Sequence, residues 1–162
     1  MRCGPVGLKL IEYFEGLRLE AYHNPGDVWT IGYGTTSGAG IDVHEGMTCT
    51  QAQAEAWLLD YIDREVVPAI ADAAKSRVVG FNENQVDALC SLGYNLGAGI
   101  FEPSHTIGAD IRDRASDGKI AADFLLYEAG GGSPHLAGLV TRREVERALF
   151  QRPIGAPNPG GI

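Results

Sequence analysis

Residues 15–35 read EGLRLEAYHNPGDVWTIGYGT, and this stretch decides how the N-terminal part of the chain folds. Gly16 follows a segment whose apolar residues recur at helical spacing, so a helix from about Pro5 to Glu15 should end here. Residues 24–27, Asn-Pro-Gly-Asp, have the composition of a tight turn. The β-branched and aromatic run at residues 28–33 then predicts a strand.

A small β lobe is expected around this strand. Glycine and threonine are frequent between residues 21 and 47, and Gly38-Ala39-Gly40 predicts a second turn. A second short strand is expected near residues 41–43, which would pair with the first as a hairpin. The sequence therefore predicts a β-hairpin lobe over about residues 21–47.

From Thr50 onward the pattern is helical. Thr50 and Gln53 form a capping box that opens a helix with one broad apolar face, and Pro68 should end or kink that helix. Asn82 and Gln85 predict the start of a second long helix. The remaining expected elements are helices near residues 104–115 and 118–127, a loop at 130–134, and a last helix capped by Thr141 and Glu144 that ends at Phe150.

The length and composition are those of a globular protein, with 162 residues, 44% hydrophobic and 21% charged. We predict an α+β fold that is mostly helical. A single domain should cover residues 1–152, with the β lobe on one side and a helical lobe, over about residues 50–150 together with the N-terminal helix, on the other. Residues 153–162, rich in proline and glycine, are expected to form a flexible tail.

Charge and cysteine content exclude some classes of function. The formal net charge of −8 disfavours binding to nucleic acid. The three cysteines, Cys3, Cys49 and Cys90, are odd in number and lack metal-ligand spacing, which favours synthesis in a reducing compartment. Cys90 lies among apolar residues and is expected in the core. The histidines are scattered as well, so we expect no metal site and no cofactor.

The sequence shows no targeting or membrane signal. The first residues lack the roughly 7–15-residue apolar core of a signal peptide, and no run approaches the roughly 18 apolar residues of a membrane span. We therefore expect the protein to have no stable association with membranes. It should remain in the cytoplasm of the producing bacterial cell until another factor releases it.

Glu15 is the first candidate for chemistry. It follows Phe14, lies four residues after Ile11 at the edge of the apolar face, and occupies the last helical turn, where the helix dipole is negative. Partial burial and a negative helix end both disfavour the ionised carboxylate. A carboxylic acid that stays protonated can donate a proton to the leaving oxygen of a glycosidic bond. The structural alternative is a surface glutamate at a helix end.

Several blocks of sequence decide between these two interpretations. EGLRLEAY at residues 15–22 is followed by VWTIGYGT at residues 28–35. Further along the chain come NQVDAL at 84–89, YNLG at 94–97, GLVTRRE at 138–144 and LF at 149–150. In this order the blocks resemble phage-type lysozymes, glycoside hydrolase family 24. The resemblance extends over most of the chain.

The resemblance implies a substrate cleft between the two lobes, with Glu15 as general acid. The Thr30 hydroxyl would position the attacking water, and Arg142 matches an arginine that can approach the catalytic glutamate. Residues where the family's helical lobe meets the glycan would contact the sugars, although aromatic side chains at such spacing are equally common in cores. These residues are Tyr94, Asn95, Phe101 and Ser104, and Arg142 is a further substrate-binding candidate.

The chain departs from the family pattern at two positions. Where the family usually has an aspartate, nine residues after the acid, this chain has Asn24, and an amide cannot serve as a general base. Three interpretations follow. Asp27 takes over the role; or Glu15 acts with a water held by Thr30 and Asn24; or the enzyme is weak or inactive. Thr35, where many relatives have histidine, has no evident catalytic consequence.

The resulting functional prediction is an endolysin-type muramidase. It would hydrolyse the β-1,4 bond between N-acetylmuramic acid and N-acetylglucosamine in bacterial peptidoglycan, inverting the anomeric centre. A holin would permeabilise the membrane so that the enzyme, expected to be a monomer, reaches the wall. The alternatives are a lytic transglycosylase, which forms 1,6-anhydromuramic ends, and a wall-binding relative without catalytic activity.

Overall fold

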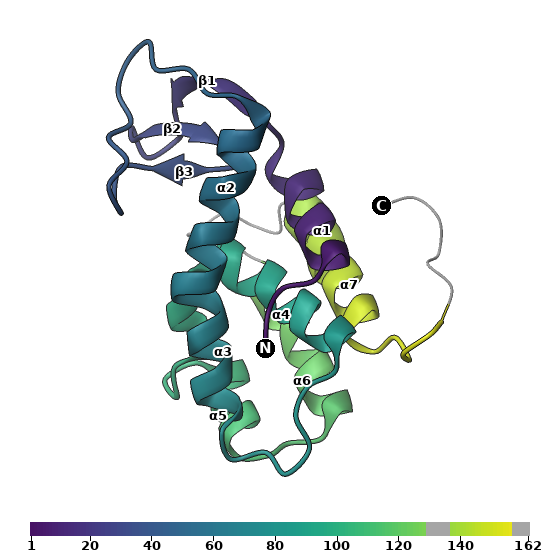
Figure 1. The fold of residues 1–162 in the computed structure, drawn as a ribbon. Coiled ribbons are helices and arrows are strands. Elements are labelled where there is room, and N and C mark those ends of the chain that lie inside the picture. The colour runs from purple at the N-terminus through teal and green to yellow at the C-terminus, as the bar shows by residue number, and fades with distance from the viewer. Residues whose placement is uncertain (129–136, 157–162) are drawn as a thin grey trace.

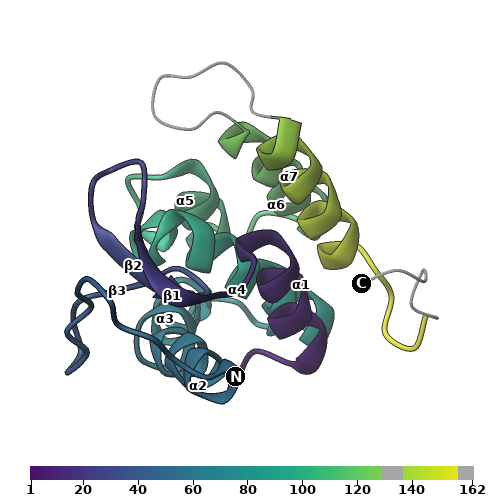
Figure 2. The ribbon, with the colours of Figure 1, turned by 90° about the horizontal axis from the view of Figure 1, so that it is seen from above.

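The computed structural model describes residues 1–128 and 137–156, which form a small β lobe and a larger helical lobe (Figures 1 and 2). The predicted mixture of mostly helix with a small sheet is confirmed. The elements in chain order are α1 (Pro5–Glu15), β1 (Arg18–His23), β2 (Trp29–Gly32), β3 (Thr35–Thr36), α2 (Gln51–Tyr61), the π-helix η1 (Ile62–Val66), α3 (Val67–Ala74), α4 (Glu83–Leu96), the 3₁₀ helix η2 (Ala98–Phe101), α5 (Thr106–Arg112), α6 (Asp117–Asp123), the 3₁₀ helix η3 (Phe124–Tyr127) and α7 (Ala137–Phe150).

Helix α1 delivers Glu15 to the junction between the lobes. Gly16 stops the helix in a left-handed conformation with φ of +69°, and its backbone N–H donates to the Glu12 carbonyl over 3.0 Å. At the other end, the Asp87 carboxylate of α4 accepts from the backbone N–H groups of Gly4 and Gly7, over 2.5 and 2.9 Å. Because these groups have no partner within the helix, Asp87 both satisfies them and fixes α1 on α4.

The sheet is antiparallel in the order β1-β2-β3, with Tyr22 opposite Thr30 and Ile31 opposite Thr35. The predicted partner strand at residues 41–43 is therefore wrong, since Ile41 makes only an isolated bridge with Gly38. Strand β1 was not predicted, although residues 18–21 alternate between polar and apolar; its side chains are mostly exposed. The β lobe consequently begins at residue 18 rather than 21.

One long helical segment, built from α2, η1 and α3, runs from the sheet into the helical lobe (Figure 1). The capping box of Thr50 and Gln53 is confirmed. Pro68 does not end the segment. In a regular α-helix, proline lacks the N–H for the backbone hydrogen bond and its ring clashes with the carbonyl four residues back. The wider π-turn just before Pro68 accommodates it. The segment therefore stays continuous across Pro68.

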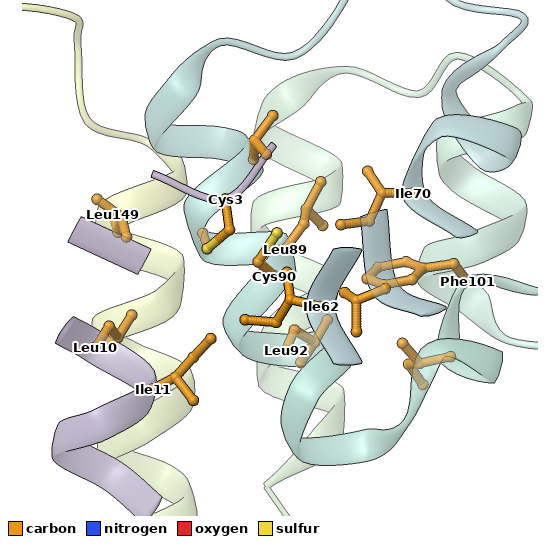
Figure 3. Close-up of a cluster of buried hydrophobic side chains, with 14 of the residues drawn as sticks. Cys3, Leu10, Ile11, Ile62, Ile70, Leu89, Cys90, Leu92, Phe101 and Leu149 are labelled. Carbon is orange, nitrogen blue, oxygen red and sulfur yellow. The ribbon is translucent and has the colours of Figure 1, made fainter. Parts of the chain in front are cut away.

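Helix α4 is the centre of the helical lobe and packs against both α1 and α7. The capping box of Asn82 and Gln85 that opens it is confirmed. Figure 3 shows Leu10 and Ile11 of α1, Leu149 of α7 and residues of α4 within one apolar cluster. Cys90 is fully buried in this cluster, as predicted.

Other element boundaries differ from those predicted. Helix α7 already includes Ala137, so Thr141 is no N-cap: its hydroxyl donates to the Ala137 carbonyl one turn earlier, a bond that threonine makes inside helices. The start of the expected flexible tail is held to the helical lobe. The carbonyls of Arg152 and Pro153 accept hydrogen bonds from the Asn84 side chain over 3.1 and 3.4 Å. The predicted loop at residues 130–134 lies outside the described residues.

Among the described residues, none of the helices combines the length and the apolar character that a membrane span requires. In residues 1–128 and 137–156, no group of three or more histidine, cysteine, aspartate or glutamate side chains is arranged to hold a metal ion.

Candidate active site

A cleft of about 640 Å³ lies between the two lobes, and Glu15 is on its wall. Its β side is formed by residues 34–39 and Ile41, and its floor by the segment α2–η1. The end of α4 closes the third side with Tyr94 and Asn95. The cleft is thus assembled from elements that are far apart in the sequence.

The Glu15 side chain is 21% exposed, and its two oxygens face different surroundings. Oε1 accepts from Nη1 of Arg142 over 2.7 Å. Oε2 is directed toward Gly34, where an added Cβ would lie 3.8 Å from it. Gly34 has a φ of +98°, which L side chains rarely adopt, so the backbone itself keeps this position free of a side chain. Oε2 is therefore the oxygen with open space beside it.

Arg142 is 4% exposed and is held by three groups besides Glu15. Its Nε donates to Oε1 of Glu146 over 3.0 Å, and its Nη2 donates to the carbonyl and the hydroxyl of Ser91 over 3.2 and 3.4 Å. The ring of Phe14 lies 5.4 Å from the guanidinium carbon, within the range of a cation–π contact. This set of contacts allows Arg142 few orientations.

Glu146 and Arg143 complete a buried charge cluster behind Arg142. Both side chains are fully buried, and Nε of Arg143 lies 2.9 Å from Oε2 of Glu146. Burial lowers the pKa of Arg143 and raises the pKa of Glu146, while the charge of each partner opposes the shift. With Glu15 and Arg142 included, the cluster holds two carboxylates and two guanidinium groups.

Tyr94 links the end of α4 to the loop between β2 and β3. Its hydroxyl donates to the carbonyl of Tyr33 over 2.8 Å, and its ring packs edge-on against Tyr61. Burial raises the pKa of Tyr94, and the negative charge of Glu15 raises it further, which places the phenol within electrostatic reach of the acid. Tyr94 therefore stays a neutral donor.

Asn24 and Asp27 form the turn before β2 and are not among the described residues that line the cleft. Oδ1 of Asn24 accepts from the backbone N–H groups of Gly26 and Val28 over 2.9 and 3.1 Å, as in an Asx turn. Asp27 has a φ of +58°, its side chain is 89% exposed, and its carboxylate contacts Nδ1 of His23. Both side chains thus serve the turn.

Thr30 is in the centre of the sheet and is 3% exposed. Its hydroxyl donates to the Val28 carbonyl over 3.0 Å. The threonine and serine residues that line the cleft in the described part of the chain are instead Thr35, Thr36 and Ser37. The position that showed no evident consequence in the sequence, Thr35, therefore lines the same cleft as Glu15.

The residues predicted to contact the glycan lie in different parts of the structure. Tyr94 and Asn95 line the cleft, whereas Ser104 is exposed outside it. Phe101 corrects the expectation of a sugar contact: it is 1% exposed and packs in the apolar cluster of Figure 3, so its ring has no free face. The core role, left open in the sequence, is the one observed.

Sequence reasoning missed the contribution of α2 and η1 to the cleft. Trp57, Asp60, Tyr61 and Arg64 line it, together with Glu65. The first four follow the spacing of one helical face, so the signal was present. Trp57 and Tyr61 belong to the broad apolar face that the sequence predicts for this helix, and such a face indicates the core more often than a cleft wall.

A carboxylic acid at a helix end, facing a cleft between a small sheet and a helical lobe, defines a glycosidase of the lysozyme class. Comparison with known proteins agrees with this class. The family model described as phage lysozyme matches residues 12–146. The chain belongs to the phage lysozyme family.

Individual relatives support the same assignment. The endolysin of Acyrthosiphon pisum secondary endosymbiont phage 1 is 35% identical over 156 residues, which cover 93% of this chain and 99% of that protein. The endolysin of Bacillus phage PZA is 37% identical over 93% of this chain, but only 55% of its own length is covered. The muramidase domain of SpmX from Asticaccaulis excentricus superposes with a TM-score of 0.78 at 29% identity, covering 94% and 99% of the two chains.

Proposed function

We propose that the protein is an endolysin-type muramidase that hydrolyses the β-1,4 bond between N-acetylmuramic acid and N-acetylglucosamine in peptidoglycan. Its membership of the phage lysozyme family and its endolysin relatives support a glycosidase that acts on the cell wall. The observation that carries the proposal is the position of Glu15, on the wall of the interlobe cleft with one oxygen held by Arg142 and the other directed toward Gly34.

In this proposal the two oxygens of Glu15 have different roles. Arg142 binds Oε1 and fixes the plane of the carboxyl group. The proton is carried by Oε2, beside Gly34, and passes to the glycosidic oxygen as the bond to the anomeric carbon breaks. Tyr94 and Asn95 would contact the sugar from the helical side of the cleft.

The attacking water is assigned to the β side of the cleft. Neither Asn24 nor Asp27 lines the cleft, so we favour a water held by hydroxyl groups of the β2–β3 hairpin, which attacks the anomeric carbon from the face opposite Glu15 and releases its proton to solvent. Thr30 is the holder expected from the family, and Thr35 is the one on the cleft wall. Thr30→Val and Thr35→Val separate the two, since the variant that removes the holder should show the larger fall in kcat.

The products of peptidoglycan digestion test the reaction itself. Hydrolysis should yield reducing N-acetylmuramic acid ends, which mass spectrometry distinguishes from 1,6-anhydro ends by the mass of one water molecule. Glu15→Gln should abolish both kinds of product. Anhydro ends from the wild type would replace the muramidase by a transglycosylase, and unchanged effects of Glu15→Gln on cells would leave a wall-binding protein.

The cellular part of the proposal concerns access to the wall. We propose that the protein acts as a monomer and depends on a holin to reach its substrate. Expression in a bacterial host without a holin should then leave the culture turbidity unchanged until the membrane is permeabilised. Lysis without permeabilisation would contradict this dependence.

A further inference from the structure

Glu146 lies behind the cleft wall, at the point where the two arginines of α7 meet. Its Oε1 accepts from the Ser91 hydroxyl over 2.6 Å, from Nε of Arg142 over 3.0 Å and from Nη2 of Arg143 over 3.2 Å. Its Oε2 lies 2.9 Å from Nε of Arg143. A fully buried carboxylate therefore holds both guanidinium groups at once.

Each arginine in turn reaches a different residue of the cleft. Arg142 donates to Glu15 over 2.7 Å, and Arg143 donates to Oδ1 of Asn95 over 2.9 Å. Both recipients line the cleft. We propose that Glu146 is a positioning residue, which fixes the two arginines and through them orients Glu15 and Asn95 toward the glycan. This inference rests on the proposed function, because it assigns Glu15 the role of the acid.

The branch through Arg142 determines where the acid is held. A guanidinium group is planar and presents its donors in a fixed fork, so occupying one edge determines the direction of the others. Glu146 occupies Nε, and Ser91 accepts from Nη2, which leaves Nη1 directed at Glu15. Without Glu146, Nε loses its acceptor and the guanidinium is free to tilt, so the carboxyl group of Glu15 moves with it.

The branch through Arg143 determines which atoms Asn95 offers to the substrate. Because its Oδ1 accepts from Arg143, the Nδ2 group with its two hydrogens remains for the cleft. An amide donor at this place suits an acetyl carbonyl oxygen on the glycan. Glu146 thus acts on catalysis through one arginine and on substrate binding through the other.

Stability alone is a weak reason for this arrangement. Burying charges is costly, and a buried ion pair replaced by well-packed apolar residues often leaves stability unchanged or higher. Arg143 and Glu146 are both fully buried, and they cancel each other's charge. The pair accordingly offers a variant that removes the network while keeping the fold.

The experiment compares three variants with the wild type on solubilised, uncrosslinked peptidoglycan strands, with kcat and KM measured from the release of reducing ends. Glu146→Gln should lower kcat by about 10–100-fold, the scale of a small misplacement of a catalytic group. The double variant Arg143→Met with Glu146→Leu should still fold, as circular dichroism reports, lose a similar factor in kcat and raise KM. Leu149→Ala, on the same helix but outside the network, should lower the melting temperature and leave kcat within about twofold.

A second measurement isolates the Asn95 branch. Asn95→Ala and Arg143→Met should each raise KM, and the double variant should raise it no further than the larger single effect, because both changes remove the same contact. Effects on KM that multiply would overturn this branch.

The remaining outcomes of these experiments also test the proposed role of Glu146. A folded Arg143→Met with Glu146→Leu variant that has wild-type kcat and KM would overturn the proposal. So would a complete loss of folding in both Glu146 variants by circular dichroism, since the role would then be structural. Retention of hydrolysis by Glu15→Gln is a different result: it would overturn the proposed role of Glu15 as the acid rather than the role of Glu146.

Discussion

Glu15 and Asn24 occupy the two positions where the family has carboxylates, and the structure holds them in opposite ways. Glu15 is fixed by Arg142, 127 residues further along the chain, in a cluster with two fully buried charges. Asn24 is fixed by backbone N–H groups two and four residues away, in an exposed turn. The acid therefore depends on the packing of α1, α4 and α7, whereas the turn depends only on its own sequence.

The difference shows where the chain has kept the requirements of catalysis. Around Glu15, each residue of the charge cluster makes further hydrogen bonds, so a substitution at one of them changes the contacts of several others. On the turn side, the amide satisfies a local need that an aspartate oxygen would satisfy equally well. Substitutions should accordingly be severe in the cluster and mild in the turn.

The largest effect should come from the acid itself. Glu15→Gln keeps the shape and a hydrogen-bond acceptor for Arg142 but cannot donate the proton, so kcat should fall by about 10²–10⁴-fold. Steady-state hydrolysis of solubilised peptidoglycan measures this, and the melting temperature serves as the control for folding. A variant within tenfold of the wild type would mean that the acid is another residue.

The next effect concerns the stability of the cluster. Arg142→Met leaves Glu146 and Glu15 without a shared cation, and removal of one partner from a buried ion pair typically costs about 3–5 kcal/mol. The free energy of unfolding in urea should drop by that order. A loss below about 1 kcal/mol would show that the cluster is no more coupled than an exposed pair.

The turn should respond more weakly. Asn24→Ala removes the acceptor of two backbone N–H groups that lie at the surface, where water can replace it, so the loss should be about 1 kcal/mol. Asn24→Asp is the matched control, because it retains the acceptor and should stay within about 0.5 kcal/mol of the wild type. Equal losses in both variants would mean that the amide donors of Asn24 matter as well.

The smallest effect is expected at Asp27. Its carboxylate is exposed and directed at His23, so Asp27→Asn should leave kcat within about threefold of the wild type. A fall of a hundredfold or more would instead identify Asp27 as the base. The turn would then have to close over the cleft during the reaction, and the contrast between the two regions would disappear.

Much of the fold followed from local patterns in the sequence. The capping boxes at Thr50 and Asn82 and the stop at Gly16 are encoded within a few residues, and all three are where they were predicted. Strand β1, the continuity of the segment across Pro68 and the early start of α7 were not predictable in this way. They depend on pairing with β2, on a π-turn and on packing against α4.

The features of the candidate site can likewise be separated into those encoded locally and those set by tertiary packing. The sequence by itself determined the family, the candidate acid Glu15, its position at a helix end and the absence of the usual carboxylate at Asn24, because each of these is a residue identity within a short motif. Only the tertiary structure decided that Glu146 joins the two arginines, that α2 and η1 line the cleft and that Phe101 is core. Contacts between residues far apart in the chain arise from how the helices pack, and a single sequence carries no local signal for them.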